Sequence, residues 1–164
     1  MSDLERACNE AATGGSDLVI LMQAIRVLLQ RGQERIRAFS SEGGAASDRQ
    51  AIQSLASDVT RDYELALGLG RVAHEVTARL KLAIESAGAT LRERVQDVRD
   101  DVSEIWRECE RTIENLDAVV FSVKFMELHA TEGIEALRSA AQSQDLEQEA
   151  VAAFDDLLRR LRRV

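Results

Sequence analysis

The side chains that could hold a metal ion are few, and their spacing does not suit that role. The chain has only two histidines, His74 and His129. His74 opens the segment HEVTA (74–78), which begins like the zinc-binding helix of a metalloprotease, but Ala78 stands where the second histidine ligand is needed. His129 has Glu132 nearby, yet the sequence lacks the paired Glu-x-x-His units of a di-metal bundle. We therefore expect no metal and no other cofactor.

Other residue groups that could bind a cofactor or carry catalysis are equally weak candidates. The segment GLGRVA (68–73) matches a dinucleotide fingerprint by its letters, but that motif works at a strand-to-helix turn, and no parallel sheet is indicated. We find no Ser/His/Asp or Cys/His grouping suited to nucleophilic catalysis. One helical face carries four acidic residues, Asp97, Asp101, Glu104 and Glu108. Like charges at this spacing repel unless water or the arginines at 159–163 lie against them.

The composition predicts an all-helical protein. Pro is absent, aromatic residues are 4% of the chain, and Ala, Leu, Glu and Arg dominate, which are residue types that lose little on entering a helix. A length of 164 residues suits one domain with a buried core. The net charge of -8 argues against a nucleic-acid partner, because phosphate binding needs a basic face.

Cysteine usage and hydropathy predict a cytoplasmic protein. Cys109 falls on an apolar helical stripe, where a reduced thiol acts as a small hydrophobic side chain, and Cys8 is the only other cysteine. The N-terminal segment does not resemble a signal peptide. The most apolar run, residues 18–29, is interrupted by Gln23 and Arg26 and is too short to span a bilayer. We expect no membrane partner.

Glycine and small polar residues mark the expected breaks between helices. They lie at Gly14-Gly15, at 40–47, at Gly88 and at 143–145. Capping boxes follow three of them, formed by Ser47 with Gln50, Thr90 with Glu93 and Asp145 with Gln148. We predict helices at about 17–40, 48–87, 90–142 and 145–163 in a single domain (1–164). The apolar stripe of the second helix continues to Leu91, which leaves open whether Gly88 is a turn or lies within a continuous helix.

The helix at 90–142 carries a heptad seam. One row repeats every seven residues: Val95, Val102, Cys109, Leu116, Val123, Ala130 and Leu137. The row beside it holds Leu91, Val98, Ile105, Val119 and Met126, with Thr112 as a polar interruption, and a third row holds Trp106, Ile113 and Val120. A seam this wide belongs to a bundle rather than a two-stranded coil. The predicted fold is an all-α, elongated antiparallel helical bundle with long coiled-coil-like helices, and we expect a homodimer.

Three apolar side chains of this helix lie away from the two main rows: Phe121, Phe125 and Leu128. They could pack on the first helix, which is apolar nearly all round, or form an exposed patch. On a soluble protein, such a patch usually marks an interface.

The segment LDAVVFSVKFMELHATEGIEALRSAAQSQD (116–145) resembles the signalling tip of bacterial chemoreceptors, the methyl-accepting chemotaxis proteins. Matching positions are Leu116, Asp117, Val119, Phe121, Met126, Leu128 and Ala130, and then, after two extra residues, Ile134, Glu135, Ala136 and Arg138. The tip's polar turn would fall at 143–145, near Asp145. The segment departs from the family at Ser122-Val123-Lys124, where tips carry Gln-Thr-Asn, at His129, where they carry Asn, and in lacking the returning apolar segment.

The resemblance implies a relative of the receptor tip that binds the coupling protein, the histidine kinase or an adaptation enzyme. We therefore predict a non-enzymatic interaction module with a homodimeric state. Its predicted contact residues are Phe121, Phe125, Met126, Leu128, Glu135, Arg138 and Asp145.

Two alternatives stay open. The segment QDLEQE (144–149) resembles the Q-D-L-x-x-Q motif of helical phosphatases that act on phosphorylated response regulators, but Glu149 occupies the position of the catalytic amide and Gln148 is one residue early. One residue rotates a side chain by about 100° around a helix, and a carboxylate would repel phosphate. The other alternative is a structural coiled-coil spacer.

Overall fold

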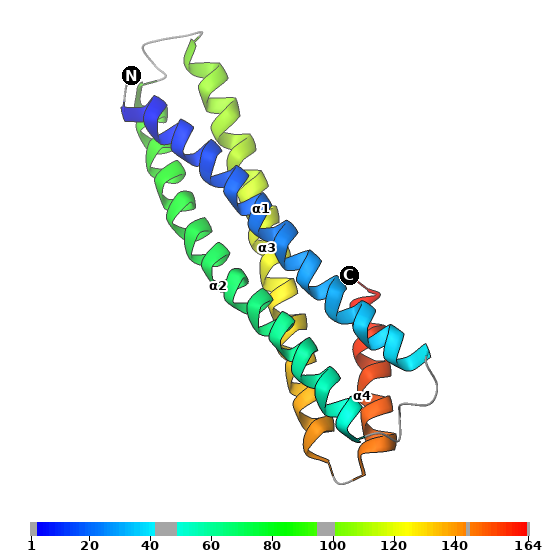
Figure 1. The fold of residues 1–164 in the computed structure, drawn as a ribbon. Helices are drawn as coiled ribbons and strands as arrows, with labels where there is room; N and C mark the ends of the chain where they lie inside the picture. The colour runs from blue at the N-terminus through cyan, green and yellow to red at the C-terminus, as the bar shows by residue number, and fades with distance from the viewer. Residues whose placement is uncertain (1–2, 42–48, 95–100, 144, 164) are drawn as a thin grey trace. The chain divides into compact units, whose positions relative to one another are not determined.

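The chain forms four α-helices (Figure 1) in a computed structural model that describes residues 3–41, 49–94, 101–143 and 145–163. The helices are α1 (Asp3–Ser41), α2 (Arg49–Arg94), α3 (Asp101–Gln142) and α4 (Leu146–Leu161). The described residues contain no strand, and the helices pack on one another, so the prediction of an all-α helical bundle is confirmed.

The predicted break at Gly14-Gly15 is wrong, and at Gly88, where a turn and a continuous helix were both open, the helix is continuous. The first helix starts at Asp3 rather than 17 and continues through Gly14-Gly15, and the second continues through Gly88 to Arg94, beyond the predicted start at 90. A glycine inside a helix costs only about 1 kcal/mol relative to alanine. A Cβ at Gly14 would overlap the Leu80 side chain, and one at Gly88 would lie 3.1 Å from Cζ3 of Trp106. Close helix contacts offset the cost.

Of the predicted helix start signals, one precedes a helix and one does not. Thr90 and Glu93 lie within α2 and do not begin a helix. Asp145 does precede α4, and the predicted break at 143–145 is confirmed, but its side chain makes no cap hydrogen bond. Instead, the backbone N–H of Asp145 donates to Ser143 Oγ at 3.2 Å. The third predicted cap, at Ser47, lies outside the described residues.

The chain divides into two compact units that share the three long helices. Unit 1 comprises Met1–Met22 and Arg71–Lys124, and unit 2 comprises Gln23–Gly70 and Phe125–Val164. Each of α1, α2 and α3 contributes one segment to each unit, whereas α4 belongs to unit 2 alone. The prediction of a single domain over 1–164 stays a prediction.

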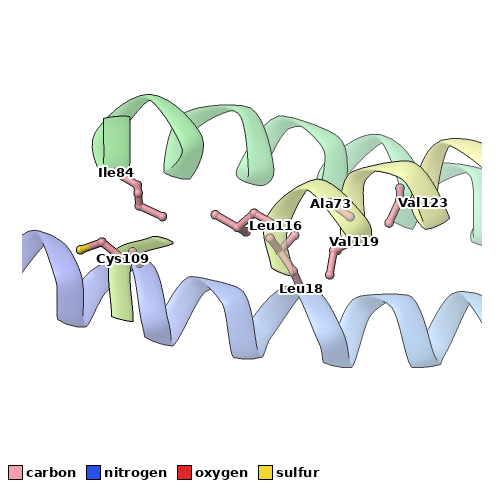
Figure 2. Close-up of a cluster of buried hydrophobic side chains, with 8 residues drawn as sticks. Leu18, Ala73, Ile84, Cys109, Leu116, Val119 and Val123 are labelled. Carbon is pink, nitrogen blue, oxygen red and sulfur yellow. The ribbon is translucent and has the colours of Figure 1, made fainter. Parts of the chain in front are cut away.

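Unit 1 is a packing of three helical segments around a small apolar core. Figure 2 shows labelled side chains of α1, α2 and α3 turned toward one another, with Leu18, Ala73, Ile84, Cys109, Leu116, Val119 and Val123 buried. On α2 and α3, Gly88 faces Trp106, and Lys81 Nζ donates to Asp117 Oδ1 at 2.7 Å. The higher residue number on α2 is paired with the lower residue number on α3, so these two segments are antiparallel.

Unit 2 adds α4 to segments of the three long helices. The Phe154 ring of α4 meets Phe39 of α1 edge-on, with ring centroids 6.0 Å apart. The centre of the unit is Tyr63 of α2, which is fully buried. One edge of its ring faces Gly32 of α1 and the other faces Gly133 of α3, and both positions leave no room for a Cβ. A tyrosine at this position requires two helix backbones to approach closely.

The sequence periodicity locates the core correctly. Along the first heptad row, the described side chains from Cys109 to Leu137 are all buried. In the second row, Val119 and Met126 are buried, and Ile105 is partly buried. On α2, six residues of the predicted stripe are buried: Ile52, Val59, Ala66, Ala73, Ile84 and Ala87. Four others are partly buried: Leu55, Leu69, Val76 and Leu80.

The first helix is longer than the sequence indicated, and its length now reaches that of a membrane-spanning helix. Because the helix continues across Gly14-Gly15, the segment Glu5–Ser41 is long and apolar enough to cross a membrane, by length and composition alone. A core helix of a soluble protein can pass the same test, and α1 contributes Leu18, Ile25, Leu29 and Ile36 to the two cores. The cytoplasmic location stays a prediction.

Candidate interaction surface

The three surplus apolar side chains of α3 are exposed to different degrees, as the second of the two alternatives requires. Phe121, in unit 1, is 73% exposed. In unit 2, Leu128 is 56% exposed and Phe125 is 36% exposed. The Phe125 ring stands edge-on to His129, with centroids 4.3 Å apart and planes at 72°.

Met126 is a correction to the predicted contact residues. It is 3% exposed and therefore belongs to the core. The reason is its place in the second heptad row, which faces neighbouring helices, and that seam outweighs its place in the receptor-tip pattern. Met126 does contribute to the wall of a cavity in unit 2.

The polar contact residues are placed differently from one another. Glu135 lies exposed on α3, two helical turns beyond Leu128. Arg138 is also exposed, but its guanidinium donates to Glu64 Oε1 of α2 and is thus held toward that helix. Asp145 is exposed at the start of α4. The structure therefore brings Phe125, Leu128 and Glu135 onto one side of α3.

This side of α3 is bordered by ion pairs to its neighbours in unit 2. Arg160 of α4 donates to Glu132 Oε2 at 2.7 Å, and Arg138 holds Glu64 on the opposite border. Leu128 lies between these borders, one turn before Glu132. We name the strip formed by Phe125, Leu128, Glu132 and Glu135 the α3 strip.

A cavity of about 340 Å³ lies beside the α3 strip in unit 2, between α1, α3 and the end of α4. Its apolar wall consists of the buried residues Leu29, Met126 and Leu161. Its polar lining consists of the more exposed residues Arg26, Gln30, Gln33 and His129. Nε2 of His129 is buried without a hydrogen-bond partner in the described part of the chain. A buried apolar wall under a polar border is the pattern of a pocket that receives an anchoring side chain.

The predicted acidic face and the predicted basic cluster have other partners among the residues that the structure describes. Arg160 also bonds Asp156 at 2.7 Å, and Arg159 lies 4.0 Å from the same residue. Glu108 of the predicted acidic face is exposed and pairs with Arg111 at 3.1 Å. Asp97 and the Asp101 side chain lie outside the described residues.

The other motifs fall within helices. The segment GLGRVA (68–73) lies inside α2, away from any strand-to-helix turn. In the phosphatase-like segment, Asp145, Gln148 and Glu149 are exposed, and Leu146 is buried. Gln144 lies outside the described residues. Phosphatase activity and the dimeric state both stay predictions.

Sequence reasoning missed two side-chain groups because each joins different helices. Cys8 of α1 and Cys109 of α3 have their Sγ atoms 2.9 Å apart in unit 1. Burial, and then the contact with Cys8, raises the pKa of the Cys109 thiol to about 12. In unit 2, the buried Asp62 accepts from Arg31 Nε at 2.9 Å and lies 3.6 Å from Arg35 Nε. The signal for Asp62 was available, since it shares the apolar stripe with Val59 and Ala66.

Comparison of the chain with protein-family models gave no match, and comparisons with curated proteins and with solved structures gave none either.

Proposed function

We propose that this protein is a non-enzymatic helical interaction module that binds a chemotaxis component through the α3 strip. The observation that carries the proposal is the 56% exposure of Leu128 on a helix whose described first heptad row, from Cys109 to Leu137, is buried. More than half of the Leu128 surface lies outside the core of unit 2, and a partner that covers it gains the free energy of apolar burial. That gain is about 1.5–3 kcal/mol for a fully buried leucine or phenylalanine.

The α3 strip combines apolar and acidic character, which defines the partner surface it suits. Phe125 and Leu128 form the apolar end, and Glu135 forms the acidic end, since Glu132 is paired with Arg160 of α4. A complementary surface has an apolar ridge followed by lysine or arginine. The neighbouring cavity of about 340 Å³ accepts one large apolar side chain of that ridge.

The class of partner comes from the receptor-tip resemblance of residues 116–145. The structure supports this choice in one respect, because α3 ends at Gln142 and α4 begins at Leu146, where a receptor tip has its turn. Receptor tips bind the coupling protein, the histidine kinase and the adaptation enzymes, so these three classes are the expected partners. We also propose that the protein is a homodimer.

Titration calorimetry with purified components tests this proposal. The full chain is titrated with a coupling protein, a chemotaxis histidine kinase and a receptor methyltransferase in separate experiments. We expect saturable binding to at least one of them. Absence of binding to all three, with the chain shown to be helical by circular dichroism, contradicts the proposed function.

A response-regulator phosphatase is the second candidate, favoured by the exposure of Asp145 and Gln148 at the start of α4. The discriminating assay follows loss of phosphate from a phosphorylated response regulator, with the wild-type chain and with Asp145→Ala. Acceleration that disappears in Asp145→Ala establishes the phosphatase, and no acceleration excludes it. A structural spacer predicts self-assembly without binding to any of the three components.

A further inference from the structure

Two cysteines that are far apart in the sequence meet in unit 1. Cys8 on α1 and Cys109 on α3 are 101 positions apart, and their Sγ atoms lie 2.9 Å from each other. Cys109 is 4% exposed and belongs to the apolar core, whereas Cys8 is only partly buried and packs against that core. Cys8 is therefore the more accessible of the two residues, and Cys109 lies beside it within the core.

We propose that Cys8 and Cys109 form a redox pair that closes to an intramolecular disulfide when the chain meets a small-molecule disulfide. In the first step, the Cys8 thiolate attacks one sulfur of the oxidant, forms a mixed disulfide and releases one thiol of the reagent. In the second step, Cys109 loses its proton and its thiolate attacks Cys8 Sγ. This attack displaces the second reagent sulfur as a thiolate, which takes up a proton, and the Cys8–Cys109 bond forms. Two protein thiols are oxidised, one reagent disulfide is reduced to two thiols, and the two protein protons leave with them.

The environments of the two thiols fix this order. A reagent can approach Cys8, while the core side chains Ala11 and Leu116 share the cluster that covers Cys109. Burial keeps Cys109 protonated at neutral pH, so it attacks a distant reagent poorly. The mixed disulfide on Cys8 presents its sulfur within reach of Cys109, and this proximity favours the second step.

The bond would tie α1 to α3 within unit 1 and stabilise the folded chain. It closes a loop of about one hundred residues, which restricts the unfolded chain strongly. For a chain of this size, the expected rise in the thermal midpoint is roughly 10 °C. Such a bond makes the stability of unit 1 respond to the thiol–disulfide balance of its surroundings.

Oxidised glutathione and the full chain provide the test. The fully reduced protein is incubated with oxidised glutathione, quenched with a maleimide and weighed by intact-mass spectrometry. We expect a monomeric product that is two hydrogens lighter than the reduced chain, carries no maleimide and no glutathione, and melts roughly 10 °C higher. Cys109→Ala should instead accumulate glutathione on Cys8.

Two controls keep the result decisive. Cys8→Ser leaves only the covered thiol, which should react with glutathione far more slowly than Cys8 in Cys109→Ala. Circular dichroism of both variants establishes that they are folded. The inference is overturned if the wild-type chain keeps glutathione on Cys8, forms only intermolecular dimers, retains two maleimide-reactive thiols, or closes without a rise in melting temperature.

Discussion

Adding a single methyl group should have opposite effects at two helical glycines of unit 2. At Gly133 of α3, a Cβ would lie 2.6 Å from Cε2 and 2.9 Å from Cδ2 of Tyr63, and 2.9 Å from Cδ1 of Leu157. At Gly68 of α2, a Cβ would meet no atom within 4 Å. Gly133→Ala therefore tests the packing of the bundle, and Gly68→Ala controls for the helix propensity of alanine.

The magnitudes follow from propensity and overlap. Alanine gains about 1 kcal/mol over glycine in a helix interior, so Gly68→Ala should raise the free energy of unfolding by about that amount. Overpacking a core costs about 1–3 kcal/mol, occasionally more. The cost at Gly133 should be at the upper end, because the Tyr63 ring cannot slide away when its other edge lies against Gly32. Because the gain in helix propensity offsets part of this cost, we expect Gly133→Ala to lower the free energy of unfolding by about 2 kcal/mol.

Thermal and urea unfolding followed by circular dichroism measure the difference. Each kcal/mol shifts the melting temperature of a chain of this size by about 2–4 °C. Gly68→Ala should melt about 2–4 °C above the wild type, and Gly133→Ala about 4–8 °C below it. In a Tyr63→Ala background, the penalty at Gly133 should become smaller, because only the contact with Leu157 remains. If Gly133→Ala is as stable as Gly68→Ala, the ring does not fill the space between the helices.

Two further predictions concern the polar groups of the same unit. Tyr63 is the only tyrosine, and burial, followed by the Asp62 carboxylate, raises its pKa well above the ordinary value of 10.0. Because the unfolded chain releases this proton at lower pH than the folded chain, the contribution of Tyr63 to stability should be fully present below pH 10 and be lost above it. Phenolate absorbance should therefore appear only together with loss of helix, and phenolate in a fully helical chain contradicts the burial. Asp62→Ala should lower the free energy of unfolding in urea by about 2 kcal/mol, because it leaves Arg31 and Arg35 without their buried acceptor. Glu64→Ala, which breaks an exposed pair, should lower it by less than about 1 kcal/mol. Equal losses in the two variants would refute the distinction between buried and exposed pairs.

Heptad spacing was sufficient to predict most of the core of α3, because seven-residue rows on one helix do not depend on which helix covers them. Glycine composition was a poorer guide than spacing: it suggested breaks at Gly14 and Gly88, where the structure uses the missing side chain for close packing against Leu80 and Trp106. A sequence pattern does not distinguish these two uses of glycine.

In the candidate site, the residues placed by helical periodicity were predicted correctly, and one residue placed by a motif was not. Phe121 and Leu128 were recognised correctly as surplus to the seam, since their exposure follows from helical periodicity alone. Met126 was assigned to the contact surface from a motif, although its heptad position already placed it in the core. The Cys8–Cys109 pair could not be found from spacing, because it depends on how α1 is aligned beside α3 in unit 1.

The most direct test of the proposed function compares two leucines of unit 2 that differ mainly in their helix. Leu128 on α3 is 56% exposed, and Leu65 on α2 is 52% exposed, so glutamate at either position should leave folding nearly unchanged. The measurement is the dissociation constant, by titration calorimetry, for the chemotaxis component that binds the wild-type chain. We predict that Leu128→Glu weakens binding at least tenfold, equivalent to about 1.4 kcal/mol, and that Leu65→Glu leaves it unchanged. Equal affinity of both variants and the wild type would show that the α3 strip is not the contact surface.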